Sequence, residues 1–245
     1  MKPLILNVDD NESGRYVKTR IVRQGGYEVL LHELEELRAE RFELMEALAE
    51  LPDDMVFFTQ ITMEAAEDTH FLDAMRKARI RGALVGVEAV TPEGLKDVYK
   101  GFNLAGEALV ERLKTFRQHG VHVLGSFIFG LPSDREHTFE ATAALAAKAD
   151  LTFAQFVLLT PFPGTIDFEK WAAKPENQET KVDGVSVTTH WLIPQEKRPK
   201  LFTPHPTMSI EDIRVRTRHA WDQFYSWDNV WRRSTVVKSM KSRIA

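Results

Sequence analysis

The 245-residue sequence contains no cysteine. This absence excludes disulfide bonds, thiolate zinc sites, cysteine nucleophiles and iron–sulfur clusters held by cysteine. Apolar runs long enough to cross a membrane are also missing. The apolar start of the chain is soon interrupted by Asn7 and Asp9. We therefore expect neither a membrane span nor a signal peptide, and a cytoplasmic location.

The charges nearly balance, since 32 basic and 36 acidic residues give a net charge of −4. No general electrostatic attraction to nucleic acid follows from such a balance, and we expect no nucleic-acid partner. The sequence is 43% hydrophobic and 28% charged, which is typical of a globular protein with one large domain or one and a half.

Residues 121–160 have the pattern of a strand, a turn, a helix and a second strand. The apolar run 121–129 ends at Gly130, as expected for a strand covered on both faces. An alanine-rich helix is predicted over 138–149, followed by a buried strand over 153–160. Such a unit belongs to a parallel α/β sheet, whose ligand sites lie where the strands end.

Two earlier strands, 52–62 and 82–89, end in polar residues. Gln60 lies near the end of the first strand. It could form hydrogen bonds to a ligand, or it could simply be one of the polar residues common at strand ends, and both interpretations stay open. Glu88 lies near the end of the second. A carboxylate there is costly unless it accepts hydrogen bonds or faces a ligand, and both alternatives remain open.

Three segments carry a family resemblance, namely 83–95 (ALVGVEAVTPEGL), 126–134 (SFIFGLPSD) and 160–165 (TPFPGT). In this order they resemble the C-terminal strands of the radical S-adenosylmethionine (SAM) barrel, most closely in its cobalamin-binding members. The resemblance runs from about Leu44 to the C-terminus. It implies an α/β fold, a partial (β/α) TIM-type barrel over residues 36–172, with a mostly helical C-terminal extension over 173–245.

The resemblance also implies which residues lie near SAM: Gln60, Glu88, Gly125, Gly130 and Pro161. Glu88 corresponds to a glutamate near the methionyl or ribose portion, and the two glycines let the adenosine approach the backbone. The chain has Phe127 where the family has an aliphatic residue and Asp134 where it has glutamate. Asp134 can still anchor the loop or cap the next helix.

The family cleaves SAM reductively at a [4Fe–4S] cluster, and its cobalamin-binding members use this for methylation or C–C bond formation. The three cysteines that bind the cluster are missing here. We therefore expect a truncated or fused member of the family that is inactive alone. Its substrate would be a small molecule of unknown identity, and a homodimer or a partner chain would complete the barrel.

Residues 1–35 carry a different resemblance. Segment 5–29 (ILNVDDNESGRYVKTRIVRQGGYEV) resembles the start of a response-regulator receiver domain, in which Asp9 and Asp10 would hold Mg²⁺. The acceptor aspartate is misplaced, because Asp53 and Asp54 precede a strand instead of ending one. Two other interpretations of this segment remain open. It could be the second strand of the barrel, or an acidic turn that merely caps the following helix. The alternative function is non-enzymatic signalling or interaction.

Overall fold

The computed structural model describes residues 4–6, 28–30, 34–101 and 105–236. Two compact units are distinguished. The smaller comprises residues 1–44 and 160–202, and the larger comprises residues 45–159 and 203–245.

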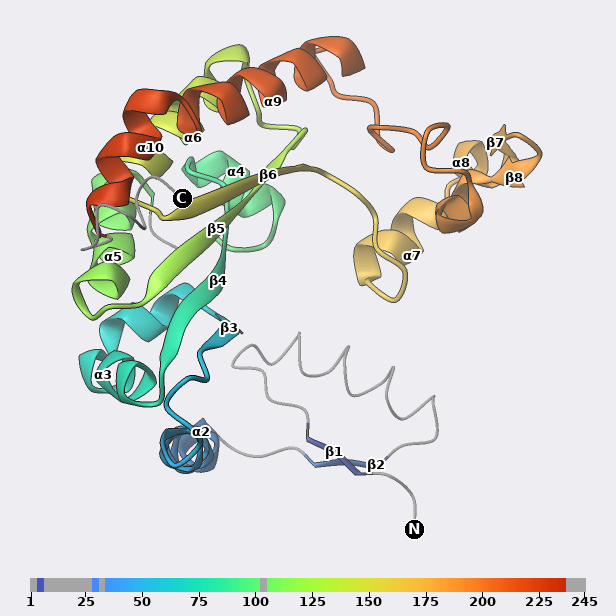
Figure 1. Cartoon of the computed structure of the whole chain (residues 1–245). Helices are drawn as coiled ribbons and strands as arrows, with labels where there is room; N and C mark the ends of the chain where they lie inside the picture. The colour runs from blue at the N-terminus through green and yellow to red at the C-terminus, as the bar shows by residue number, and fades with distance from the viewer. Residues whose placement is uncertain (1–3, 7–27, 31–33, 102–104, 237–245) are drawn as a thin grey trace. The chain divides into compact units, whose positions relative to one another are not determined.

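The larger unit is built on a parallel sheet with the strand order β3–β4–β5–β6 (Figure 1). Its strands are β3 (Phe57–Ile61), β4 (Ile80–Glu88), β5 (His122–Phe129) and β6 (Phe153–Leu158). Strands adjacent in the sequence are adjacent in the sheet, and their connections contain helices, as parallel pairing requires. The predicted α/β class and parallel strands are confirmed.

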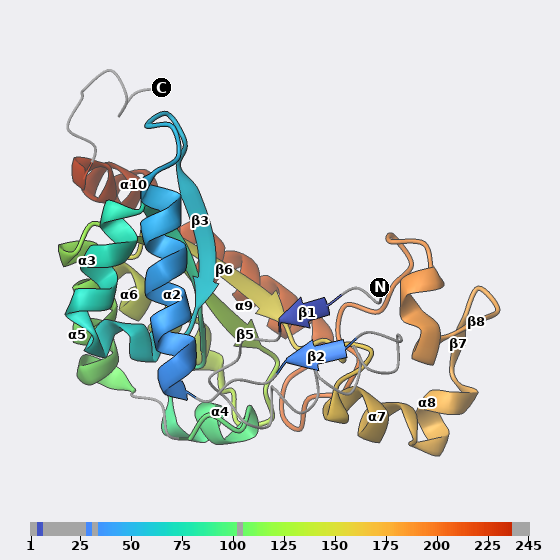
Figure 2. The same cartoon turned by 90° about the horizontal axis from the view of Figure 1, so that it is seen from below.

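Helices cover one face of this sheet. Figures 1 and 2 agree in placing α3, α5 and α6 on the same side of the strands. The side chains that the strands direct to that side are buried, among them Val85, Phe127 and Phe156. The helical elements of the unit are η1 (Met63–Glu67), α3 (Thr69–Lys77), α4 (Pro92–Asp97), α5 (Gly106–Gln118), α6 (Glu136–Lys148), α9 (Ile210–Phe224), α10 (Trp227–Arg233) and η3 (Ser234–Val236).

Several helices begin at side-chain caps. Asp68, Thr91 and Ser209 each accept a backbone N–H from the first turn, at 3.0, 3.1 and 3.1 Å. Pro92 follows Thr91 at the first helical position, where its missing N–H has no intrahelical partner to lose.

The opposite face of the sheet is open, so the expectation that β5 is covered on both faces is wrong. Phe58, Phe153 and Val157 are 60%, 53% and 40% exposed, while Leu124 and Ile128 are half-buried. The alternation along β5 is that of a sheet covered on one side. These four strands form an open sheet and do not close into a barrel.

The smaller unit contains a parallel pair of strands, β1 (Leu4–Leu6) and β2 (Glu28–Leu30). The boundary between the units falls within α2 (Leu34–Ala49). Further along the chain are α7 (Ile166–Ala172), α8 (Pro175–Glu179), β7 (Lys181–Val182), β8 (Val185–Ser186) and η2 (Val187–Leu192).

A tight hairpin joins β7 and β8, as the Asp-Gly pair predicts. Asp183 and Gly184 have φ values of 52° and 78°. Two successive residues with positive φ define the type I′ turn, whose twist matches that of antiparallel strands.

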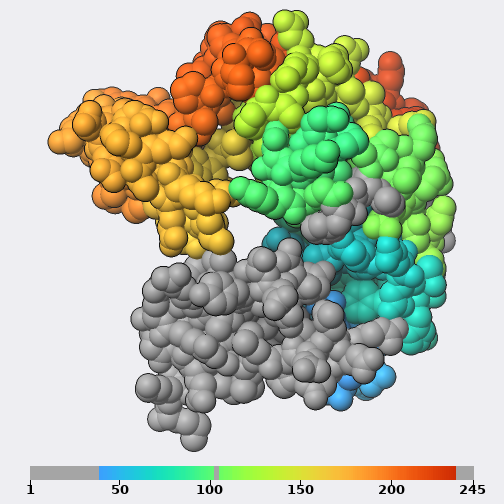
Figure 3. Space-filling view, turned by 180° about the vertical axis from the view of Figure 1, so that it is seen from behind, coloured from blue at the N-terminus to red at the C-terminus, as the bar shows by residue number. Residues whose placement is uncertain are grey.

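Side chains of α9 close the β6 end of the sheet. The Tyr225 hydroxyl accepts the N–H of Ala154 at 3.1 Å and donates to the carbonyl of the same residue at 2.9 Å. The indole N–H of Trp221 donates to the carbonyl of Phe156 at 3.4 Å. Helix α9 also packs against α6, as the adjoining orange and yellow-green side chains in Figure 3 show. These bonds occupy edge groups that would otherwise pair with another strand.

Removing the Tyr225 hydroxyl tests this closure. Tyr225→Phe should lower the free energy of unfolding by about 1 kcal/mol, because a backbone N–H and a carbonyl lose one partner together. Urea unfolding measures the change. Trp227→Phe, at a side chain that is 83% exposed, is the control and should have little effect. Equal stability of Tyr225→Phe and the wild type would contradict this role.

Candidate functional site

The carboxyl ends of the four strands meet at one edge of the larger unit, because the strands are parallel. Three of the residues predicted near SAM lie at or near this edge. Gln60 is exposed one residue before the end of β3, Glu88 ends β4, and Gly130 follows β5.

The backbone at Glu88 is strained. Glu88 has a φ of +67°, which is rare for a residue with a side chain. The N–H of Ala89 donates to the carbonyl of Val87 at 2.9 Å, so the chain turns sharply around Glu88 as in a γ-turn. The register with β5 also shifts between Gly86 and Glu88, which marks a β-bulge. Bulges and strained residues concentrate at sites where a side chain must be directed to a function.

Lys100 holds the Glu88 carboxylate in place. Its Nζ lies 3.1 Å from Glu88 Oε1 and 3.4 Å from the carbonyl oxygen of Gly86. The two charged side chains are 18% and 33% exposed, so the ion pair is partly desolvated yet still reachable. A Cβ on Gly86 would lie 2.4 Å from Glu88 Oε1. A side chain at position 86 would therefore displace the carboxylate from this place over the strand.

This ion pair keeps free bonding capacity. Within the described residues, the second carboxylate oxygen of Glu88 and the third ammonium proton of Lys100 have no hydrogen-bond partner. A ligand can therefore donate to one and accept from the other. Sequence reasoning missed Lys100, because a lysine in the loop after a short helix looks like an ordinary surface residue.

A polar row crosses the open face beside Gly86. Ser126 is opposite Gly86 on β5, and Gln155 is opposite Ser126 on β6. Gln155 Nε2 donates to Ser126 Oγ at 2.9 Å. Neither residue was predicted as a site residue, although each is a polar position inside an otherwise apolar strand.

Buried Asp134 anchors the loop after β5. Its Oδ2 accepts the backbone N–H of Gly130 at 2.8 Å and that of Leu131 at 3.0 Å. Asp97 of α4 accepts the N–H of Ser133 at 2.9 Å. Of the two predicted roles for Asp134, loop anchor and helix cap, the structure shows the anchor. Burial raises the pKa of Asp134 to about 6, and the two N–H bonds oppose that shift.

Gly125 and Pro161 occupy different surroundings. A Cβ on Gly125 would lie 2.6 Å from Leu151 Cδ1 and 3.1 Å from the Phe127 ring. Core packing on the helix-covered face therefore accounts for this glycine, without any ligand. Pro161 belongs to the smaller unit, where its carbonyl lies 3.1 Å from His190 Nε2.

Metal ligation by Asp9 and Asp10 concerns residues outside the described part of the chain. Among the residues that the structure describes, no three His, Asp or Glu side chains converge as metal ligands. Within the same residues, no helix is long and apolar enough to cross a membrane.

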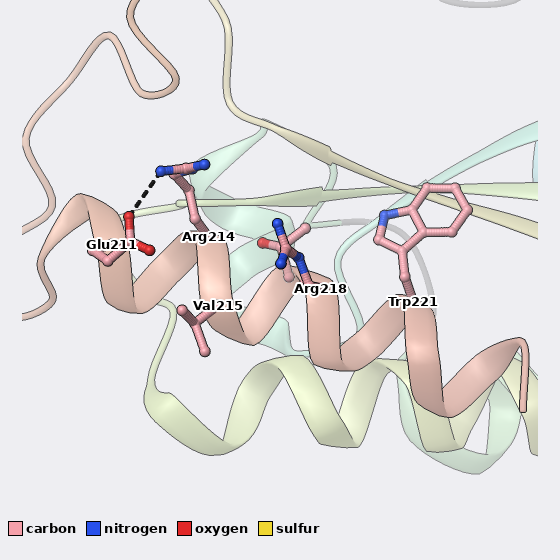
Figure 4. A pocket seen from close by; sticks show the side chains of 6 residues that line it. Glu211, Arg214, Val215, Arg218 and Trp221 are labelled. Atoms are coloured by element: carbon pink, nitrogen blue, oxygen red, sulfur yellow. Dashed lines mark hydrogen bonds and ion pairs between the residues drawn. The ribbon is translucent and has the colours of Figure 1, made fainter.

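Helix α9 carries a separate shallow hollow of about 290 Å³ (Figure 4). Glu211 pairs with Arg214 at 2.8 Å, and the Trp221 indole N–H is bonded to β6. One helix supplies the whole lining, and no strand end contributes, so we place the candidate site at the strands instead. The lining residues are Glu211, Arg214, Val215, Thr217, Arg218 and Trp221.

No protein-family model matches the chain. Among curated proteins, it is similar to an uncharacterised methyltransferase of Pyrococcus horikoshii, with 36% identity over 157 residues, 62% of this chain and 30% of that protein. It is also similar to the hopanoid C-2 methylase of Rhodopseudomonas palustris, with 25% identity over 242 residues, 97% of this chain and 41% of the methylase. The chain thus spans less than half the length of both relatives.

A solved structure has the same fold. It is TsrM of Kitasatospora setae, a radical SAM methyltransferase with tryptophan substrate and the SAM analogue aza-SAM bound. The TM-score is 0.55 at 16% identity, over 88% of this chain and 47% of TsrM. The sheet is therefore of the type found in a radical SAM methyltransferase, and the two curated relatives are methyltransferases by name. Neither of them is a response regulator, although the methylase alignment extends into residues 1–35.

The raised pKa of Asp134 predicts a pH dependence of stability. The folded protein retains the proton up to about pH 6, whereas the ordinary pKa is 3.8. The contribution of Asp134 to the free energy of unfolding is therefore largest below the ordinary pKa of 3.8. It falls as the pH rises from there to about 6, by on the order of 3 kcal/mol.

Urea unfolding of Asp134→Asn and the wild type between about pH 4 and 7 measures the difference. The free-energy gap between the two proteins should change across the window, because asparagine does not titrate. Asp167→Asn, at an exposed carboxyl group, is the control. A constant gap between wild type and Asp134→Asn would show that the Asp134 pKa is not raised.

Proposed function

We propose that this chain binds SAM at the carboxyl ends of β3, β4 and β5, on the open face of the sheet, as the SAM-side part of a radical SAM methyltransferase. The Glu88–Lys100 pair over Gly86 is the observation that carries the proposal. It presents a carboxylate and an ammonium group together at the end of a strand that is strained and bulged.

The chemistry of the pair matches the methionyl end of SAM. That end carries an α-ammonium group and an α-carboxylate, so Glu88 can accept from the first and Lys100 can donate to the second. Charge-assisted bonds of this kind are about twice as strong as neutral ones. The sulfonium adds a further positive charge, which favours a site with a carboxylate.

The rest of the edge suits the nucleoside portion. Gly130 has a φ of +88°, which glycine adopts without strain, so the chain can turn away directly at the end of β5. Ser126 and Gln155 offer a hydroxyl and an amide on the open face, and exposed Gln60 adds a second amide. SAM bound in this way would supply an electrophilic methyl group or, after reductive cleavage, an adenosyl radical.

The chain does not fit a [4Fe–4S] cluster, because it has no cysteine. We therefore assign no cluster-dependent step to it and propose that it is inactive alone. The cluster would have to be held by another polypeptide segment, and β3 is the end of the sheet available for such a segment. In the described residues β3 pairs only with β4, whereas α9 closes β6. We assign no residue to cobalamin.

The receiver-like alternative has no observation in its favour. Asp9 and Asp10 lie outside the described residues, and the methylase alignment covers 97% of this chain. A signalling role is therefore not a second candidate.

Calorimetric titration with SAM tests the proposal. The wild type should bind with a dissociation constant on the order of micromolar, and Glu88→Ala should weaken binding roughly 10- to 100-fold. Glu93→Ala, an exposed acid on α4, is the matched control and should bind like the wild type. Absence of binding in the folded wild type would overturn the proposal.

Cluster reconstitution tests the second part of the proposal. The purified chain, treated with iron and sulfide and then reduced, should show no [4Fe–4S]⁺ signal by electron paramagnetic resonance, because thiolate ligands are missing. A signal in stoichiometric amount would show that other side chains can hold the cluster.

A further inference from the structure

One histidine links the segment before α9 to the loop after β5. His205 Nε2 lies 2.9 Å from the carbonyl oxygen of Leu131, although the two residues are 74 positions apart in the sequence. Leu131 directly follows Gly130, so this contact is made next to the proposed SAM site.

The hydrogen bonds of the ring determine its tautomer. His205 Nδ1 lies 3.2 Å from the backbone N of Thr207 and 3.1 Å from that of Met208. Backbone N–H groups only donate, so Nδ1 must accept. The proton of the neutral ring is therefore on Nε2, which donates to Leu131.

The Leu131 carbonyl is doubly satisfied. It also accepts the N–H of Asp134 at 2.9 Å, so both acceptor positions of this buried oxygen are used. Removal of the histidine would leave one position without its partner in a residue that is 1% exposed.

Leu131 is also packed against the Glu88 end of β4. Its side chain forms a buried cluster with Ala89 and Leu95. Ala89 is the residue after Glu88 and donates the bond that closes the γ-turn. A displacement of Leu131 would therefore disturb the residue that fixes the backbone of Glu88.

We propose that His205 is a positioning residue for SAM binding. By donating to Leu131 it ties the loop after β5 to the segment that begins α9, and so couples the C-terminal part of the larger unit to SAM affinity. This inference rests on the proposed SAM site. His205 itself does not touch the ligand.

Two conservative variants separate the two hydrogen bonds of the ring. In His205→Gln the side-chain NH₂ replaces Nε2 and can still reach Leu131. In His205→Asn the side-chain oxygen replaces Nδ1 and can still accept from residues 207 and 208, as in an Asx turn, but the link to Leu131 is lost. His205→Leu removes both bonds, and His219→Asn is an exposed control on α9.

Calorimetry should rank the variants by whether they keep the hydrogen bond to Leu131. His205→Gln and His219→Asn should bind SAM within about twofold of the wild type. His205→Asn and His205→Leu should bind roughly 5- to 10-fold more weakly, the effect of about one net hydrogen bond. If instead His205→Asn binds like the wild type and His205→Gln is weakened, the histidine only supports the turn before α9, and the inference is overturned.

Amide hydrogen exchange of Gly130 and Leu131 gives a readout that does not need SAM. Both N–H groups should exchange faster in His205→Asn and His205→Leu than in the wild type and His205→Gln. If the wild type fails to bind SAM, the proposed function fails while the exchange rates still test the link. Unchanged exchange in all variants, or changed exchange with unchanged SAM affinity, would overturn the positioning role.

Discussion

The ion pair between Glu88 and Lys100 is the interaction on which the candidate site depends. A carboxylate at the end of a buried strand, on a backbone with positive φ, is costly in desolvation and in strain. The ammonium group of Lys100, 3.1 Å from the carboxylate, offsets the desolvation cost. The hydrogen bond from Ala89 to Val87 holds the strained turn closed. Removing either partner would leave a partly buried charge uncompensated. A ligand that carries both an acid and an ammonium group fits this pair without leaving either charge alone.

The surroundings of the pair are held by the loop after β5. Asp134 fixes two N–H groups, Asp97 fixes a third, and His205 fixes the carbonyl of Leu131. The loop is thus tied to α4 and to the segment before α9, which are far apart in the sequence. At the other edge of the sheet, Tyr225 and Trp221 bond the free groups of β6. Helix α9 therefore both ends the sheet and connects to its ligand-side loop.

Local pattern predicted the strand and helix of this unit well. The apolar run before Gly130 forms β5, and the alanine-rich segment after it forms α6. Each of these features depends on neighbours within a few residues. The coverage of β5 on both faces was predicted wrongly, because an apolar run does not reveal how many strands and helices are present to bury it.

The site was predicted less completely. Glu88 and Gly130 could be chosen because they fall in recognisable segments, whereas Lys100 is twelve residues from Glu88 and reaches it only through the fold. At Gly125 the contact with Leu151 on the covered face is enough to explain the missing side chain, and the sequence does not reveal that contact. Long-range contacts of this kind are set by packing, which sequence spacing does not determine.

Mapping of backbone amide chemical shifts during titration with SAM would test the central claim most directly. Binding at the proposed site should perturb the amides of Gly86, Ala89 and Gly130, at the carboxyl ends of β4 and β5. Perturbations confined to the hollow on α9, or none at saturating SAM in a folded sample, would contradict it.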